Sequence, residues 1–155
     1  MENFYKLLYP MRVCLIGASH NGIDNFMPAS WTYPLSASPP IFGVAIAKAR
    51  YTFDLMKSSG FFTINVPGFD MKDKLEKFGR LSGRDGDKFK AWGVTKEKCE
   101  IPSVAIAEAL YTIECKIVNE IEVGDHIIFA GEVVNVKKRR EGKGIYQSKN
   151  GFLEI

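Results

Sequence analysis

The residues best suited to chemistry in this 155-residue chain follow the apolar run Ile41–Ala47. Lys48, Arg50, Tyr51 and Thr52 stand where the sequence predicts that a helix begins. The first turn of a helix has unbonded N–H groups and a positive dipole end, so it favours an anion such as phosphate. A guanidinium binds phosphate with two bonds, and a lysine and a threonine add a charge and a hydroxyl. Basic residues at a helix start are also common as plain surface charges, so this pattern alone leaves both interpretations open.

A longer pattern around these residues, from Asn25 to Thr52, is more specific. It contains N-x-M-x-A-S-W, P-L-S and P-P, then the apolar run, and finally K-x-R-Y-T. This order resembles flavin reductase-like proteins, whose fold is the FMN-binding split β-barrel. Similar pieces continue at 60–67 and 124–133, and in the closing Tyr146 and Gly151-Phe152. The resemblance covers most of the chain and implies a single FMN-binding domain over residues 1–155.

The resemblance implies a role for each matching residue. One loop would lie along the isoalloxazine ring, where backbone amides and a serine hydroxyl stabilise the charge of reduced flavin. In that loop Pro28 stands where many relatives have threonine, and proline offers neither a hydroxyl nor an amide donor, so one flavin contact is in question. The ring-facing residues would be Met27, Pro28, Ala29, Ser30 and Trp31. The other cofactor-binding residues would be Asn25, Ala45, Ile46, Ala47, Lys48, Arg50, Tyr51, Thr52 and Lys88.

Three of the candidate residues have two interpretations each. Trp31 begins a strand, so it belongs to the core or a subunit interface, or it contacts the flavin. His126 is the candidate catalytic residue, and it either satisfies backbone groups or contacts flavin or nicotinamide and responds to pH. Lys88 lies in a segment, 82–89, that resembles the S-G-x-x-x-D-K-F loop of the family. It either approaches the flavin or a nicotinamide phosphate, or it belongs to a plain surface loop.

The elements that must position these residues are mostly strands. Short β-branched and aromatic runs separated by Gly, Pro, Asn and Asp predict a mainly β fold, here a Greek-key-like FMN-binding split β-barrel with a few short helices. We predict helices at 52–59, capped by Thr52 and ended by Gly60, and at about 71–78, ended by Gly79. A mobile surface loop is predicted from 80 to 90, and a tight turn at 123–125. The predicted strands are 12–17, 30–35, 41–47, 61–66, 111–118 and 126–136.

Composition excludes several classes of protein. The formal net charge of +3 is spread along the chain, and the one basic cluster, 137–140, reads as a solvated strand end, so no nucleic-acid partner is expected. No apolar segment approaches the ~18 residues that span a bilayer, and no signal peptide is evident, so we expect no membrane partner and a cytoplasmic location. Three scattered cysteines indicate neither disulfides nor a metal site. Cys14 and Cys115 lie in apolar runs and are expected to be buried.

The function predicted from the resemblance is an NAD(P)H-dependent flavin oxidoreductase with tightly bound FMN. NADH or NADPH would pass a hydride to the flavin, and reduced flavin or ferric complexes would be downstream acceptors. The missing G-x-G-x-x-G motif does not count against this, because the family binds nicotinamide over the flavin face. Two alternatives remain: a non-enzymatic flavoredoxin-type electron carrier with a redox partner, and a degenerate dimeric barrel used only for interaction. The resemblance also implies a homodimer with flavin near the subunit interface, and strand 126–136, apolar on both faces, is consistent with it.

Overall fold

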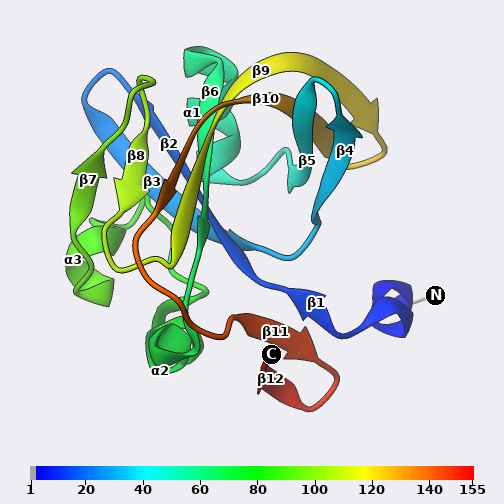
Figure 1. The fold of residues 1–155 in the computed structure, drawn as a ribbon, viewed down its shortest axis with the longest axis vertical. Helices are drawn as coiled ribbons and strands as arrows, with labels where there is room; N and C mark the ends of the chain where they lie inside the picture. Colours follow the sequence, from blue (N-terminus) through cyan, green and yellow to red (C-terminus); the bar gives the residue numbers. More distant parts are fainter. Residues whose placement is uncertain (1–2) are drawn as a thin grey trace.

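Residues 3–155 are described by a computed structural model, and their arrangement is shown in Figure 1. The helical segments are η1 (Phe4–Leu8), α1 (Tyr51–Ser59), η2 (Phe69–Met71), α2 (Lys72–Phe78) and α3 (Lys88–Trp92). The strands are β1 (Met11–Arg12), β2 (Cys14–His20), β3 (Ile23–Ala29), β4 (Thr32–Ala37), β5 (Pro40–Ala47), β6 (Phe61–Val66), β7 (Lys96–Lys98), β8 (Val104–Ile106), β9 (Tyr111–Val123), β10 (His126–Lys138), β11 (Ile145–Ser148) and β12 (Gly151–Glu154).

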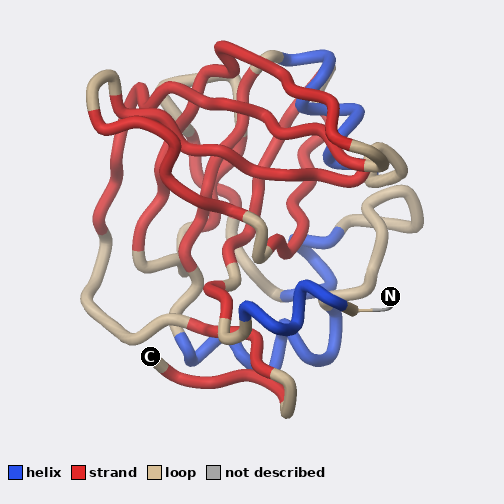
Figure 2. Tube along the Cα trace, turned by 90° about the vertical axis from the view of Figure 1, so that its right-hand side faces the viewer, coloured by secondary structure: helices blue, strands red, loops and turns tan. Residues whose placement is uncertain are grey.

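One antiparallel sheet of seven strands dominates the structure, in the order β3-β2-β6-β9-β10-β5-β4. Its two edge strands, β3 and β4, follow each other in the sequence with only Ser30 and Trp31 between them. A two-residue link between opposite edges requires the sheet to curl until those edges approach. Figure 2 shows the strands of this sheet as one curled body, with helical segments at its margins and the small sheet of β1, β11 and β12 below it. This mainly β, curled arrangement confirms the predicted fold class.

Apolar side chains form two cores, one on each side of strands β2 and β3. The first core contains Ile16, Val44, Phe62 and Phe129. The second lies against α2 and α3, and there Phe26 packs edge-on against Phe89 and Trp92 at centroid distances of 4.8 and 5.1 Å. Because side chains alternate along a strand, the burial of Phe26 toward α3 turns its two neighbours toward the opposite face. These neighbours, Asn25 and Met27, line the groove described below.

Several predicted elements are confirmed by the structure. Strand β6 has the predicted bounds, and the tight turn joins β9 to β10 with Gly124 at φ 58°. Gly60 ends α1 in the left-handed conformation, at φ 79°. Cys14 and Cys115 are both buried. No helix within residues 3–155 is long and apolar enough to cross a membrane.

Other predictions were wrong in position or kind. Helix α1 begins one residue early, with Arg50 at its N-cap, so Thr52 lies inside the helix and does not cap it. The ring-facing loop is in large part strand β3. The predicted surface loop ends early, because Asp87 accepts hydrogen bonds from the amides of Phe89 and Lys90 and so caps α3. Strands β3, β7, β8, β11 and β12 were not predicted.

Candidate cofactor-binding groove

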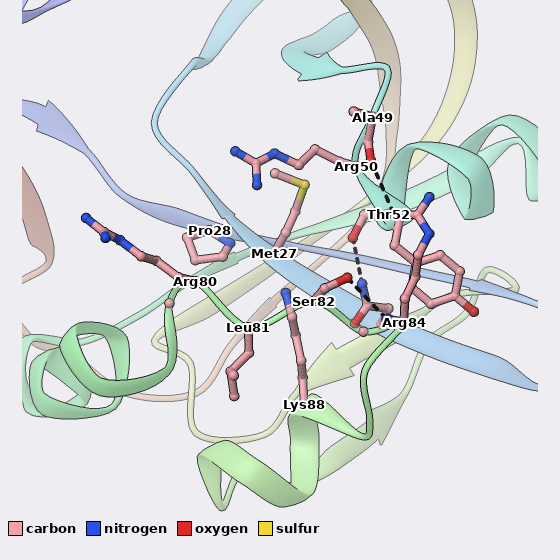
Figure 3. A pocket seen from close by; sticks show the side chains of 14 residues that line it. Met27, Pro28, Ala49, Arg50, Thr52, Arg80, Leu81, Ser82, Arg84 and Lys88 are labelled. Atoms are coloured by element: carbon pink, nitrogen blue, oxygen red, sulfur yellow. Dashed lines mark hydrogen bonds between the residues drawn. The ribbon is translucent and has the colours of Figure 1, made fainter.

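Two adjoining cavities form a groove between β3, β5 and the start of α1. They share Met27, Pro28 and Arg50, and their volumes are about 300 and 320 Å³. We call the first, shown in Figure 3, the polar lobe, and the second the apolar lobe. The polar lobe is also lined by Asn25, Ala49, Tyr51, Thr52, Gly79, Arg80, Leu81, Ser82, Gly83, Arg84 and Lys88. The apolar lobe is also lined by Tyr5, Ala29, Ser30, Trp31, Ala45, Ala47 and His126.

The N-terminus of α1 opens into the polar lobe. The N-cap residue Arg50 has an extended backbone, at φ −77° and ψ 141°, and its side chain does not cap the helix. The first amides of a helix have no intrahelical acceptor, and Tyr51 and Thr52 at this end both line the lobe. The exposed Arg50 side chain forms no ion pair within the part of the chain that the structure describes, and Figure 3 shows its guanidinium above Met27. Amides, dipole and guanidinium together favour an anion at this point.

A buried hydrogen bond fixes the helix start to strand β3. The Asn25 amide Nδ2 donates to Thr52 Oγ1 at 3.0 Å, and the two residues are 2% and 1% exposed. A buried polar side chain must be hydrogen-bonded to avoid a desolvation cost, so this pair holds α1 in one position over β3. The Thr52 hydroxyl therefore acts first as an acceptor that positions the helix.

Lys88 supplies a buried cation to the polar lobe. It is 6% exposed, and its Nζ donates to the carbonyl oxygen of Phe26 at 2.8 Å. Figure 3 shows its side chain rising from α3 toward Pro28 and Ser82. Burial, followed by the nearby positive charge of Arg50, lowers the pKa of Lys88 from 10.5 to about 8. One of its three N–H bonds is occupied by Phe26, so the remaining donors are available to an anion in the lobe.

Strand β5 gives the apolar lobe its shape. Ala45 and Ala47 line the lobe, whereas Ile46 between them is 1% exposed and belongs to the first core. This follows the two-residue alternation of a strand. Small side chains at both lining positions leave room for a flat ligand against the sheet. Of the three predicted residues on β5, the structure therefore places two in the groove and one behind it.

An aromatic stack forms one wall of the apolar lobe. The rings of Trp31 and His126 lie 4.7 Å apart at 29°, and Tyr5 packs edge-on against Trp31 at 5.6 Å. His126 Nδ1 lies 2.6 Å from the Asp125 carboxylate, and this hydrogen bond lowers the pKa of Asp125. The imidazole faces the lobe and is held by a side chain rather than by backbone groups. Trp31 also lines an outer hollow, so it contacts both the groove and the molecular surface.

Lys48 is a predicted phosphate-binding residue that the structure places outside the groove. Its ammonium pairs with Glu122 at the end of β9, and the residue lines neither lobe. The backbone explains this, because Lys48 N donates to Asp125 O and ties the residue to the β9–β10 turn. Sequence reasoning missed Tyr5, Ala49 and the stretch 79–84 as lining residues. The segment similar to the S-G-x-x-x-D-K-F loop was the available signal for Ser82 and Arg84.

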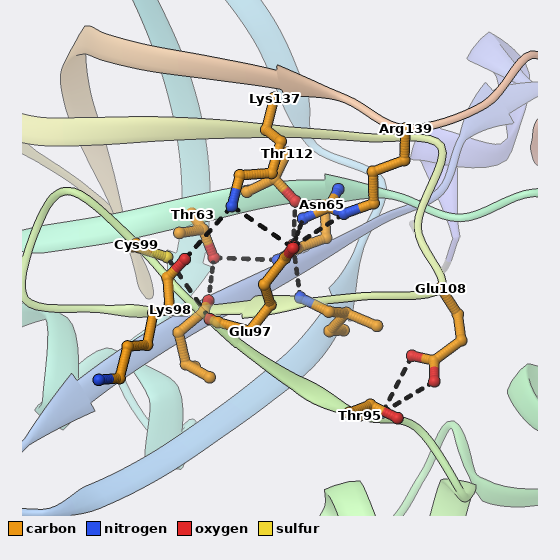
Figure 4. Close-up of polar contacts among 12 residues, drawn as sticks. Thr63, Asn65, Thr95, Glu97, Lys98, Cys99, Glu108, Thr112, Lys137 and Arg139 are labelled. Atoms are coloured by element: carbon orange, nitrogen blue, oxygen red, sulfur yellow. Dashed lines mark hydrogen bonds and ion pairs between the residues drawn. The ribbon is translucent and has the colours of Figure 1, made fainter.

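The basic cluster at the end of β10 belongs to a separate polar network, shown in Figure 4. Arg139 and Lys137 both pair with Glu97 on β7, and Arg139 Nε donates to that carboxylate at 2.8 Å. Beneath them the buried Asn65 accepts from Thr112 and from the amide of Ile106. These contacts join β7 and β8 to the main sheet. The cluster is therefore engaged in structure, at a distance in sequence and space from the groove.

Comparison with known proteins shows the family to which the chain belongs. Residues 5–151 match the family of the flavin reductase like domain. An uncharacterised protein of Archaeoglobus fulgidus is 38% identical over 139 residues, which are 86% of this chain and 76% of that protein. A ferric-chelate reductase (NAD(P)H) of the same organism is 26% identical over 145 residues, 92% of this chain and 83% of the reductase.

Solved structures of flavin-binding proteins have a similar fold. The flavoredoxin of Methanosarcina acetivorans superposes with a TM-score of 0.86 at 25% identity, covering 96% of this chain and 86% of that one. An FMN-binding protein of Thermus thermophilus superposes with a TM-score of 0.89 at 27% identity, covering 99% and 90%. The chain belongs to the flavin reductase-like family, as the motifs between Asn25 and Thr52 predicted.

Proposed function

We propose that the protein binds FMN in the two-lobed groove and passes hydride from NADH or NADPH to it. The observation that carries this proposal is the order of the lobes. A flat apolar lobe beside Ala45 and Ala47 continues, past Met27 and Pro28, into a basic lobe at a helix N-terminus. FMN has the same order of parts: an aromatic ring, a polyol chain and a terminal phosphate. The residues present therefore fit the cofactor.

Each part of the groove has a task toward that cofactor. The first amides of α1, Arg50 and Lys88 hold the phosphate, because each places positive charge or an unbonded donor in the polar lobe. The Ser30 hydroxyl and the amides beside it are the donors for the polar edge of the ring. Pro28 lines both lobes without an amide donor, so it contributes only shape.

When bound, FMN would supply the redox chemistry, as the acceptor of the hydride that the nicotinamide donates. The protein contributes position and electrostatics. His126 and Trp31 form the wall of the apolar lobe, where they orient the ring and border the space for the nicotinamide. Because hydride transfer needs no side-chain acid, we expect His126 to have only a modest effect on rate.

The test is anaerobic mixing of the purified protein, loaded with FMN, with NADH and separately with NADPH. Bleaching of the flavin absorbance by either donor supports the proposal. Arg50→Ala should weaken FMN binding without unfolding the protein, whereas Lys48→Ala, outside the groove, should leave binding unchanged. A protein that holds FMN but is bleached by neither donor contradicts the reductase activity.

The second candidate function is an electron carrier that holds FMN and receives electrons from a redox partner. The similarity to the Methanosarcina acetivorans flavoredoxin favours it. A carrier is bleached by dithionite and by neither nicotinamide, so the same experiment separates the two functions. A protein with no affinity for flavin would instead act only as an interaction module. Ferric complexes remain the proposed acceptors for the reductase, by analogy with the archaeal ferric-chelate reductase.

We also propose a homodimer in which a second copy covers the outer hollow beside the apolar lobe. This hollow, of about 680 Å³, is lined mainly by apolar side chains from η1, β1 and β4. Phe4, Leu7 and Leu8 on η1 are 58%, 78% and 74% exposed. Contiguous apolar exposure of this kind marks a surface that is covered in the working protein. Since Trp31 lines both the hollow and the groove, the flavin would lie near the subunit boundary.

A further inference from the structure

The segment 79–87, which we call the strap, crosses the polar lobe from the end of α2 to the cap of α3. Six consecutive strap residues, 79–84, line the lobe, opposite Ala49, Arg50, Tyr51 and Thr52. Figure 3 shows the strap and the start of α1 on either side of the cavity. The strap is thus the wall that faces the proposed phosphate site.

Arg84 ties the strap to the far wall. Its Nη1 donates to the carbonyl oxygen of Ala49 at 3.2 Å, and its Nη2 donates to the Asp54 carboxylate at 2.8 Å. The guanidinium carbon also lies 5.0 Å from the centroid of the Tyr51 ring. All three partners belong to the α1 side of the lobe, so one side chain bridges the cavity wall to wall.

The strap is also seated on the floor of the lobe. A Cβ added to Gly83 would lie 2.3 Å from Asn25 Oδ1, so the backbone there touches the asparagine side chain. Asn25 cannot yield easily, because it is buried and bonded to Thr52. Glycine at this position therefore lets the strap lie directly on the residue that fixes the start of α1.

We propose that the strap, closed by Arg84, selects the mononucleotide FMN over the dinucleotide FAD. This inference rests on the proposed function. A flavin phosphate at the first amides of α1 has the ribityl chain on its Met27 side and the Arg84 bridge on its other side. In FMN that phosphate is terminal, so nothing continues beyond it. In FAD the same phosphate is bonded to a second phosphate and an adenosine, which must pass through the space between α1 and the strap.

FAD can therefore bind only if the Arg84 contacts break and the strap lifts from Asn25. That cost falls on FAD alone, because FMN leaves all of these contacts intact. Removing the bridge should improve FAD binding relative to FMN binding, so the ratio of the two dissociation constants is the quantity to measure.

The experiment measures dissociation constants of FMN and FAD by titration calorimetry for the wild type, Arg84→Ala and Arg140→Ala. Arg140 is a matched control, because it also pairs with an exposed carboxylate, Asp70, and donates to a backbone carbonyl, that of Glu108, away from the groove. We expect the wild type to prefer FMN, and Arg84→Ala to reduce that preference by about tenfold through tighter FAD binding. Arg140→Ala should leave it unchanged.

Three outcomes overturn the inference: equal affinity of the wild type for both flavins, an unchanged preference in Arg84→Ala, or an equal change in Arg140→Ala. If the wild type binds neither flavin, the proposed function itself fails, which is a different result. Circular dichroism reports whether Arg84→Ala is folded. If it is not, Asp54→Ala, which removes one of the two hydrogen bonds of the bridge, provides the same comparison with a smaller expected change.

Discussion

The side chains of Asn25 and Thr52 are hydrogen-bonded to each other inside the protein, at 3.0 Å, although they lie 27 positions apart. Asn25 belongs to β3, whose next residues line both lobes of the groove, and Thr52 belongs to the helix that opens into the polar lobe. This buried bond therefore holds β3, the strand proposed to contact the flavin ring, against the start of α1, the proposed phosphate site.

Thr52→Val should lower both stability and FMN affinity. Valine has the shape of threonine without the hydroxyl, so the Asn25 amide loses its acceptor while buried, at a cost of about 1–3 kcal/mol in the free energy of unfolding. Urea denaturation measures this change. Thr95→Val, at an exposed threonine whose hydroxyl forms no hydrogen bond within residues 3–155, is the control and should change stability by less than about 0.5 kcal/mol. Equal losses in the two variants would contradict a positioning role for Thr52.

Ala45→Leu should block the apolar lobe. Ala45 lines the cavity on β5, and a leucine there fills space that the proposed ring requires. Overfilling a well-packed site costs about 1–3 kcal/mol, which corresponds to roughly a 10- to 100-fold weaker affinity for FMN. Fluorescence titration of FMN measures it. Ala37→Leu, at an exposed position of β4 outside the groove, should bind FMN as the wild type does. Unchanged affinity in Ala45→Leu would place the ring elsewhere.

Lys88 should make FMN binding depend on pH. Its pKa of about 8 means that the empty lobe loses this positive charge as pH rises through 8, so the affinity for the phosphate should fall above that pH. In Lys88→Met the affinity should be lower near pH 7 and the decline above pH 8 should be absent. Calorimetric titrations between pH 6.5 and about 9.5, where the lysine titrates, measure both effects. A wild-type affinity that is constant across this range would contradict a contact between Lys88 and the phosphate.

The same residue should have the opposite effect on the stability of the empty protein. The folded-state pKa is about 8 and the ordinary value is 10.5, so between these pH values the unfolded chain binds the extra proton. Stability rises with pH wherever the unfolded state binds more protons. The free energy of unfolding of the wild type, relative to Lys88→Met, should therefore increase from pH 8 to 10.5. Urea denaturation at several pH values measures this difference, and a decrease would show that the ammonium is not desolvated.

Leu7→Glu combined with Leu8→Glu should yield a monomer. Both leucines are more than 70% exposed on η1, beside the outer hollow, and a buried charge at a subunit interface without a partner is strongly unfavourable. Light scattering after size-exclusion chromatography measures the mass in solution. The control is Ile155→Glu, at an exposed residue at the end of the chain, which should leave the mass unchanged. A wild type that is monomeric at all concentrations would contradict the proposed dimer.

The motifs predicted the family and most of the groove, because they are local patterns that keep their spacing in the fold. The residues on β5 show that the motifs did not predict which side chains face the groove. Sequence alone placed Ala45, Ile46 and Ala47 together, but the alternation of the strand turns Ile46 into the core. Lys48 lies outside both lobes for a related reason, since its partner Glu122 lies 74 positions away and only the curled sheet brings them together.

Helix α3 shows a second limit of prediction from the sequence, which is the length of the element. Its five residues are too few for a helical period to be visible, and only the cap at Asp87 and the left-handed Gly93 mark its ends. Without that helix, the burial of Lys88 could not be predicted. The strap was likewise predicted as a loop, but its closure depends on contacts of Arg84 with residues 30 or more positions away.

The short link between β3 and β4 has a consequence for how such a protein can change over time. Ser30 and Trp31 join the two margins of the sheet and also line the apolar lobe. An insertion or deletion of one residue there would shift the register of a neighbouring strand and move its side chains to the opposite face of the sheet. The lining of the apolar lobe and the closure of the barrel would then be lost together. The strap carries no strand pairing. A change there, at Arg84 for example, alters the groove without disturbing the sheet, so new cofactor preferences should arise there first.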